Sequence, residues 1–154
     1  INPEPIEIIN NSLHFCYSNN QLRIHSYVIM PNHIHLIISD VNYDNERLAK
    51  TLTDFRKYTG HKLADYIDAN LSESIAQSIR ANQLTDRIRQ IWKSGWHAEA
   101  LSSEKFLIQK VNYIHENPVR KGFVKLPEQW RHSSAGYWIN GDNPEIPITP
   151  FGQT

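Results

Sequence analysis

Two histidines separated by one isoleucine, His33 and His35, stand in the apolar run HIHLIIS. Side chains alternate along a β-strand, so both imidazoles would leave one face while Ile34 and Leu36 leave the other. Two neutral imidazoles at this spacing can chelate one divalent cation. A solvent-facing or hydrogen-bonded histidine pair is the alternative, and the spacing by itself does not exclude it.

A second candidate cluster lies in NYIHENPVRKGFV, where Tyr113 and Asn117 are four residues apart. In a helix this spacing puts the two side chains one turn apart on nearly the same face. The apolar stripe of that helix is centred on Leu107, Val111 and Ile114, and the pair falls to one side of it. The Tyr113 hydroxyl could therefore reach a cleft. A tyrosine at the border of the core, with its ring packed and its hydroxyl in water, is the ordinary alternative.

The elements that would carry the histidines are predicted from the first forty residues. Residues 5–19 form an amphipathic run that we interpret as a helix of about three turns. Residues 22–30 and 33–39 are rich in β-branched and aromatic side chains, which is typical of strands. Pro31-Asn32 between them has the chemistry of a tight turn, so the two strands should form a hairpin.

Helical spacing of apolar residues begins near Glu46, and we expect Gly60 to interrupt that helix. Residues 61–83 should continue as one or more helices with polar breaks. Residues 87–101 alternate enough to form one strand or a pair of strands around Gly95.

The helix that would carry Tyr113 has sequence signals at both ends. Ser102 or Ser103 can cap its start, since a serine oxygen accepts hydrogen bonds from the first free amides. Asn117-Pro118 should end it, because the residue before a proline avoids the helical region. The chain after Val124 is expected to be mostly irregular.

Length and composition favour one domain with an apolar core: the chain has 154 residues, including four Trp, seven Tyr and five Phe. We expect a single α+β domain with an antiparallel sheet and flanking helices at residues 1–140, and an irregular tail at residues 141–154. The single cysteine, Cys16, cannot form a disulfide within the chain, and no apolar run is long enough to span a membrane. A cytoplasmic protein without a membrane partner is therefore expected.

The formal net charge is zero, yet the charges are unevenly distributed. Residues 1–44 carry one basic residue against four acidic ones, whereas residues 80–131 carry ten basic residues against five acidic ones. The basic second half could bind phosphates, and a solvated surface of uneven charge explains the same counts equally well.

The order of the motifs resembles a known family. YVIMPNHIHLII, a helical stretch, W-x-x-x-W-H, YIHENPVRKGFV and PEQWRHSSAGYW follow one another over residues 23–138, as in the single-tyrosine HUH transposases. The chain is most similar to the REP-associated tyrosine transposases, which are relatives of the insertion-sequence enzymes acting on single strands. This resemblance implies a ferredoxin-like, RRM-like HUH nuclease fold. The family begins with a further strand before its first helix, so the sheet expected here lacks that strand, through truncation or an unusual N-terminus.

The resemblance also implies the roles of the candidate residues. Tyr113 would be the nucleophile, and His33, His35 and Asn117 would bind Mg²⁺ or Mn²⁺. Such an ion can neutralise the oxygens of a scissile phosphate and orient the bond. Tyr113 would attack the phosphorus, leaving a 5′-phosphotyrosine link and a free 3′-OH that can later reverse the reaction on another strand end.

The partner implied by the resemblance is a single-stranded DNA hairpin from a repeated palindrome, bound by a monomer or a homodimer. Candidates for contacting its backbone are Arg56, Lys57, Lys62, Arg120, Lys121 and Arg131. Trp96 and Trp130 are close to some of them in sequence and could stack bases. His97 and His115 could act as a general base, although a structural or supporting role is the expectation for each.

Two other functions compete with this interpretation. A domesticated hairpin-binding protein would keep the fold without the chemistry, but binding alone requires neither Tyr113 nor the two histidines. An unrelated metal hydrolase would use the two histidines together with His97, and it would keep its activity when Tyr113 becomes phenylalanine. A replication initiator is disfavoured, because no phosphate-binding G-x-x-x-x-G-K-[ST] loop is present.

Overall fold

The computed structural model describes residues 3–81, 91–93, 98–101 and 103–153. Most of the segment predicted to form strands around Gly95, with Trp96 and His97, lies outside these residues. Its described parts, 91–93 and 98–101, carry no strand. None of the helices described is both long enough and apolar enough to cross a membrane.

The centre of the fold is an antiparallel hairpin of β1 (Leu22–Met30) and β2 (His33–Asp40). Both predicted strands and the Pro31-Asn32 turn between them are confirmed. A bulge around His25 shifts the register of the pairing by one residue near the start of β1, at the far end of the hairpin from the turn. With helices around this two-stranded sheet, the predicted α+β class is confirmed for the described part of the chain.

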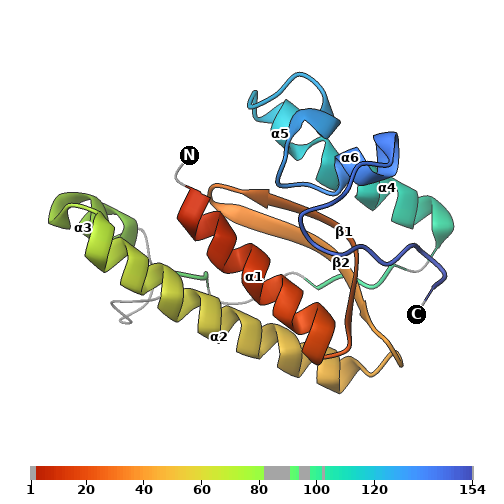
Figure 1. Ribbon diagram of the computed structural model, residues 1–154, viewed down its shortest axis with the longest axis horizontal. Helices are drawn as coiled ribbons and strands as arrows, with labels where there is room; N and C mark the ends of the chain where they lie inside the picture. Colours follow the sequence, from red (N-terminus) through yellow and green to blue (C-terminus); the bar gives the residue numbers. More distant parts are fainter. Residues whose placement is uncertain (1–2, 82–90, 94–97, 102, 154) are drawn as a thin grey trace.

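Helices and turns complete the chain on both sides of the hairpin (Figure 1). In chain order these are α1 (Pro3–Asn19), α2 (Asn45–Asn70), α3 (Glu73–Ala81), α4 (Glu104–His115), α5 (Asn117–Arg120), the 3-10 helix η1 (Pro127–Gln129) and α6 (Ala135–Asn140).

Different helices cover the two faces of the hairpin. Ile34, Leu36 and Ile38 of β2 pack into a core that α1 and α2 complete. Ile37 belongs to a second core, in which Ile114 of α4 packs against β1. Figure 1 accordingly shows α4, α5 and α6 together on one side of the hairpin, with α1 and α2 on the other. The alternation of β2 therefore decides which side chains can face α4.

Gly60 does not interrupt α2, contrary to the prediction. A Cβ atom at this position would lie 3.3 Å from Cδ1 of Trp92. The indole Nε1 of Trp92 donates to Thr59 Oγ1 at 3.0 Å, which holds the ring against the helix. Gly60 therefore makes room for a side chain from a distant segment, and the helix tolerates its unfavourable propensity of about 1 kcal/mol.

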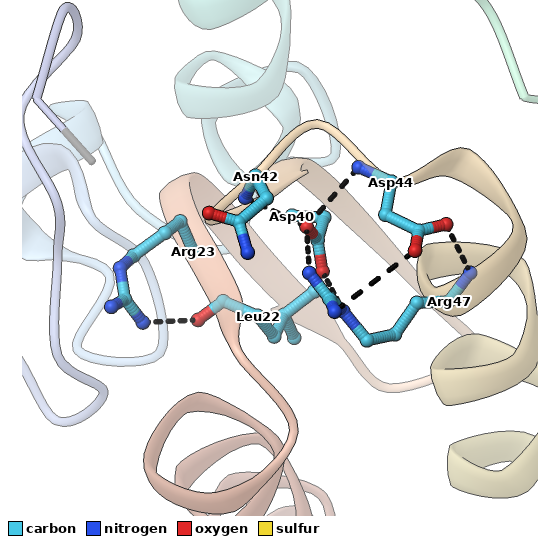
Figure 2. A network of polar contacts seen from close by, with 6 residues as sticks. All are labelled: Leu22, Arg23, Asp40, Asn42, Asp44 and Arg47. Atoms are coloured by element: carbon cyan, nitrogen blue, oxygen red, sulfur yellow. Dashed lines mark hydrogen bonds and ion pairs between the residues drawn. The ribbon is translucent and has the colours of Figure 1, made fainter.

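Asp40 connects the end of β2 to the start of α2 (Figure 2). Its buried carboxylate accepts hydrogen bonds from the amides of Asn42 at 2.8 Å and Asp44 at 3.1 Å. Arg47 donates to the same carboxylate from Nε and from Nη2, each at 2.6 Å. These bonds, those of Arg47 above all, hold the pKa of Asp40 far below its usual range. Asp44 in turn caps α2 by accepting from the Arg47 amide at 2.9 Å.

The C-terminal part of the chain lies along the outer edge of β1. The Ile29 amide donates to the His132 carbonyl at 2.8 Å, and the Thr149 amide donates to the Ile24 carbonyl at 2.8 Å. Ile146 is fully buried in the core beside α1. The backbone groups on this edge are therefore paired by residues that come more than a hundred positions later.

Candidate active site

His33, His35 and Tyr113 come together on the face of the hairpin that α4 covers. The ring centroids of the two histidines are 5.0 Å apart, and the Tyr113 centroid lies 5.7 Å from that of His35. Both contacts are edge-to-face. Tyr113 is 50% exposed, so a substrate can reach this residue from solvent. The predicted orientation of the histidines, opposite Ile34 and Leu36, is confirmed.

The apolar face of α4 fixes the tyrosine at this position. Ile114 is buried, and Leu107 and Val111 pack beside it against the same core, as the helical projection predicted. Ser103 caps the helix by accepting from the Phe106 amide at 3.2 Å, which agrees with one of the two predicted caps. Because this face is buried, the neighbouring position of Tyr113 must lie at the border of the core.

His115 anchors the end of α4 to two other elements. Its Nε2 lies 3.0 Å from Ser26 Oγ of β1 and 2.9 Å from Ser134 Oγ, and the two hydroxyl oxygens are 3.1 Å apart. All three side chains are buried, and burial lowers the pKa of His115 to about 4. The structure thus places His115, two residues after Tyr113, in a buried hydrogen-bonded cluster with Ser26 and Ser134.

His33 is oriented by the residue before it, which the sequence had indicated only as a turn residue. His33 Nδ1 lies 2.6 Å from Asn32 Oδ1. Because an amide oxygen only accepts, this bond puts the proton on Nδ1 and leaves the lone pair on Nε2. A side-chain acceptor directly before a candidate histidine ligand is the sequence signal that could have identified this role.

The surroundings of both histidines favour the neutral form that a metal ligand requires. Burial lowers the pKa of His33, with a smaller contribution from the positive charge of Lys121. Burial likewise lowers the pKa of His35, followed by the charges of His33, Arg120 and Lys110. Among the described residues, neither ring nitrogen of His35 has a hydrogen-bond partner, so whichever nitrogen lacks the proton is available to a metal ion.

Asn117 follows the tyrosine by one turn and is buried. Its Nδ2 donates to the Tyr113 carbonyl at 3.2 Å, which leaves the amide oxygen for other contacts. Helix α4 ends at His115, slightly before the predicted stop at Asn117-Pro118, and Asn117 opens the short helix α5. Pro118 is tolerated near the start of α5, where a missing N–H costs no helical hydrogen bond.

These donors fit a divalent cation. Two neutral imidazoles and an amide oxygen are ligands that first-row divalent metals accept. In the part of the chain that the structure describes, no cluster of three His, Cys, Asp or Glu side chains is placed to hold a metal. Asn117, one helical turn after Tyr113, stays the third ligand that the resemblance implies beside His33 and His35.

Two of the six basic candidates, Arg120 and Lys121, lie at this cluster. The Arg120 guanidinium carbon is 4.3 Å from the centroid of the Tyr113 ring, and Nη2 donates to the Tyr113 carbonyl at 2.8 Å. Lys121 is exposed and close enough for its charge to act on His33. The site is thus surrounded by positive charge, which favours an anionic substrate.

The other basic candidates lie elsewhere. Arg56, Lys57 and Lys62 belong to α2, which packs on the opposite face of the hairpin. Arg56 donates to the Lys93 carbonyl, and Lys57 and Lys62 line a shallow exposed groove of about 290 Å³ on α2. Arg131 forms an ion pair with Glu145 at 2.5 Å.

Trp130 is a core residue, which corrects the expectation that it could stack bases. Only 9% of its surface is exposed, and its indole Nε1 donates to the Ile29 carbonyl at 3.0 Å. Trp96 and His97, which were also candidates, lie outside the described residues.

The chain is similar to a curated protein of Haemophilus influenzae (strain ATCC 51907 / DSM 11121 / KW20 / Rd) that is named "Putative REP-associated tyrosine transposase". The two are 26% identical over 132 residues, which is 78% of this chain and 67% of the relative. No protein-family model and no solved structure matches the chain. The resemblance to the REP-associated tyrosine transposases is thus confirmed by a relative that carries their name.

Proposed function

We propose that this chain cuts and rejoins single-stranded DNA, with Tyr113 as the nucleophile. The observation that carries the proposal is the meeting of Tyr113 with His33 and His35, from two distant segments, at an accessible and positively charged surface. A protein that only binds DNA has no need of this arrangement.

In the proposed reaction the phenol oxygen of Tyr113 attacks the phosphorus of a phosphodiester. The new bond joins the tyrosine to the 5′ phosphate, the bond to the 3′ oxygen breaks, and that oxygen leaves as a hydroxyl after taking up a proton. The phenol proton is released to solvent. A 3′-OH of another strand end can attack the phosphotyrosine in the reverse sense, so the strands are rejoined without ATP.

His33, His35 and Asn117 would hold Mg²⁺ or Mn²⁺ in this proposal. The ion would supply charge neutralisation at the scissile phosphate oxygens. Asn32 would keep the Nε2 lone pair of His33 free for this purpose. The buried cluster of His115 would hold the tyrosine helix against β1, the strand that pairs with the histidine-bearing strand β2.

The proposed substrate is a hairpin-forming single strand from a repeated palindrome, acted on by a monomer or a homodimer. Arg120 and Lys121 provide positive charge beside the tyrosine, and phosphates in single strands bind to such surfaces in a salt-dependent manner. Arg56, Lys57, Lys62 and Arg131 would contact a longer substrate only if it passed beyond the tyrosine face.

The proposal is tested by covalent capture. The protein is incubated with end-labelled hairpin oligonucleotides from the flanks of its own gene, with Mg²⁺ or Mn²⁺, and a DNA-linked protein band is sought on denaturing gels. Tyr113→Phe should abolish the band. Tyr43→Phe is the matched control, because Tyr43 is exposed and follows the opposite end of the hairpin.

Each outcome distinguishes the candidate functions. An adduct that EDTA and Tyr113→Phe both remove, and that Tyr43→Phe leaves, supports the tyrosine mechanism. Tight binding without an adduct under any metal would point to a binding protein. Cleavage that persists in Tyr113→Phe would assign the chemistry to a metal-bound water instead.

A further inference from the structure

Arg120 has an arrangement that its role as a contact for the DNA backbone does not require. It is an exposed residue at the end of α5, yet its guanidinium turns back over the ring of Tyr113, with its carbon 4.3 Å from the ring centroid. A free lysine or arginine on a solvated surface would extend into water.

The backbone between the two residues builds this contact. Helix α5 begins at Asn117, one residue after α4 ends, and the intervening Glu116 keeps right-handed helical torsion angles. Arg120 thus lies seven residues after Tyr113, about two helical turns on, and its long side chain reaches back to the end of α4. Its Nη2 then donates to the Tyr113 carbonyl at 2.8 Å.

The Tyr113 ring is therefore held from two sides. His35 meets it edge-to-face at 5.7 Å, and the Arg120 guanidinium covers a face at 4.3 Å. The ring is otherwise half-exposed, and a half-exposed tyrosine changes rotamer readily unless its neighbours restrict it. A planar guanidinium that is itself tied to the tyrosine's own backbone can restrict it.

We infer that Arg120 is a positioning residue, which holds the Tyr113 ring beside the histidine pair in the orientation needed for attack. The inference rests on the proposed function for its consequence in catalysis. It assigns to Arg120 a role that differs from binding the DNA backbone, since it acts through the tyrosine. Loss of positioning lowers the rate of chemistry, whereas loss of a backbone contact lowers affinity.

The experiment compares Arg120→Gln and Arg120→Lys with Lys125→Gln. Lysine keeps the charge of Arg120 but loses the planar stacking surface and the forked donors. Lys125→Gln removes one positive charge at an exposed position that belongs neither to the proposed catalytic residues nor to the proposed DNA contacts. Single-turnover adduct formation is measured at saturating hairpin DNA, and the DNA dissociation constant is measured separately by fluorescence anisotropy.

We expect both Arg120 variants to slow adduct formation roughly 5- to 50-fold at saturating DNA. Arg120→Lys should keep the dissociation constant within about 2-fold of wild type, since a backbone contact is mainly a matter of charge. Lys125→Gln should leave the rate of adduct formation near that of wild type. A normal rate in both Arg120 variants, or a loss in Arg120→Gln that is confined to affinity, would overturn the inference.

A second readout does not depend on activity. The protein is prepared with 3-fluorotyrosine, and the ¹⁹F signal of Tyr113 is identified among the seven tyrosines by its loss in Tyr113→Phe. The signal should move in both Arg120 variants and stay in place in Lys125→Gln. If the wild type forms no adduct, the proposed function fails, while the ¹⁹F signal still decides whether Arg120 holds Tyr113. An unmoved signal would overturn the inference in either case.

Discussion

The polar side chains at the two ends of the β1–β2 hairpin differ in how fully they are hydrogen-bonded. At the far end, the Asp40 carboxylate is buried and receives four hydrogen bonds, two of them from Arg47 (Figure 2). At the turn end, His35 has no hydrogen-bond partner among the described residues, and His33 donates one hydrogen bond, to Asn32. Tyr113 beside them is half-exposed.

This difference separates a structural end from a functional end of the same two strands. Buried polar groups are normally satisfied, because an unsatisfied one costs about 1–3 kcal/mol. The Asp40 network follows that rule and fixes the start of α2. The histidine pair is only partly buried and leaves ring nitrogens without a protein partner, which suits a ligand. Changes at the two ends should therefore affect different measurements.

The largest expected effect is on activity at the turn end. Replacing both histidines, His33→Ala with His35→Ala, should reduce adduct formation at least about 100-fold, because the proposed metal loses two of its ligands. The melting temperature should change by less than about 3 °C, since neither side chain completes a buried network. Wild type with EDTA should show the same loss of activity. A large drop in melting temperature in the double variant would break the comparison.

The far end should show a large effect on stability. Asp40→Asn replaces one acceptor oxygen by an NH₂ group that faces the donors of Arg47, so the melting temperature should fall by roughly 5–10 °C. Adduct formation by the folded protein, assayed well below that temperature, should stay within about 2-fold of wild type. Asp54→Asn is the matched control, because it breaks only the exposed ion pair with Lys50. Activity lost in proportion to stability would refute the separation.

A smaller and pH-dependent effect on stability is expected from the buried cluster of His115, Ser26 and Ser134. Burial lowers the pKa of His115 from 6.5 to about 4, so the unfolded chain takes up this proton at higher pH than the folded chain. Stability should therefore fall as the pH drops from 6.5 toward 4, at up to about 1.4 kcal/mol per pH unit. Burial lowers the pKa of His25 as well, which acts in the same direction.

The measurement is urea unfolding at a series of pH values, with His115→Gln beside the wild type. Glutamine keeps hydrogen-bonding capacity toward Ser26 and Ser134 but does not titrate, so its stability should depend less on pH across this range. Equal slopes in the two proteins would mean that His115 is not the group responsible.

The smallest expected effect sharpens the comparison at the turn. Asn32→Ala removes the acceptor that fixes the protonated nitrogen of His33, and Asn32→Asp restores an acceptor. We expect the alanine variant to bind Mn²⁺ roughly 3- to 10-fold more weakly, by titration with an electron-spin readout, and the aspartate variant at least as tightly as wild type. Equal affinities in all three proteins would limit Asn32 to a role in the turn.

The hairpin and the faces of its side chains were predictable, because strand periodicity and Pro-Asn turn chemistry are local properties. The placement of Tyr113 beside the apolar stripe of α4 was also predictable from local spacing. Gly60 was interpreted wrongly, because the glycine leaves room for the ring of Trp92 against the helix. Trp92 donates to the Thr59 hydroxyl and lies 33 positions further along the chain. Local patterns contain no information on such a partner.

The charged residues were the least predictable part of the site. Six lysines and arginines were equivalent as positive charges in the sequence, yet Arg120 lies over the tyrosine while Arg131 is paired with Glu145. Whether a basic side chain covers the tyrosine or pairs with an acidic one depends on the geometry of α5 and on the path of the C-terminal segment. Neither can be derived from charge patterning. Trp130 was misjudged for the same reason, since its burial depends on where β1 lies.

The pairing of the β1 edge with the C-terminal segment has a consequence for the order of events during synthesis. Residues 22–30 have left the ribosome long before His132 and Thr149 are made. The amide of Ile29 and the carbonyl of Ile24 therefore lack their native hydrogen-bond partners during this time. Contacts so distant in sequence form late and slowly. Until residues 132–149 emerge, this edge is open to the strand of another nascent chain, and this segment then protects the fold against that encounter.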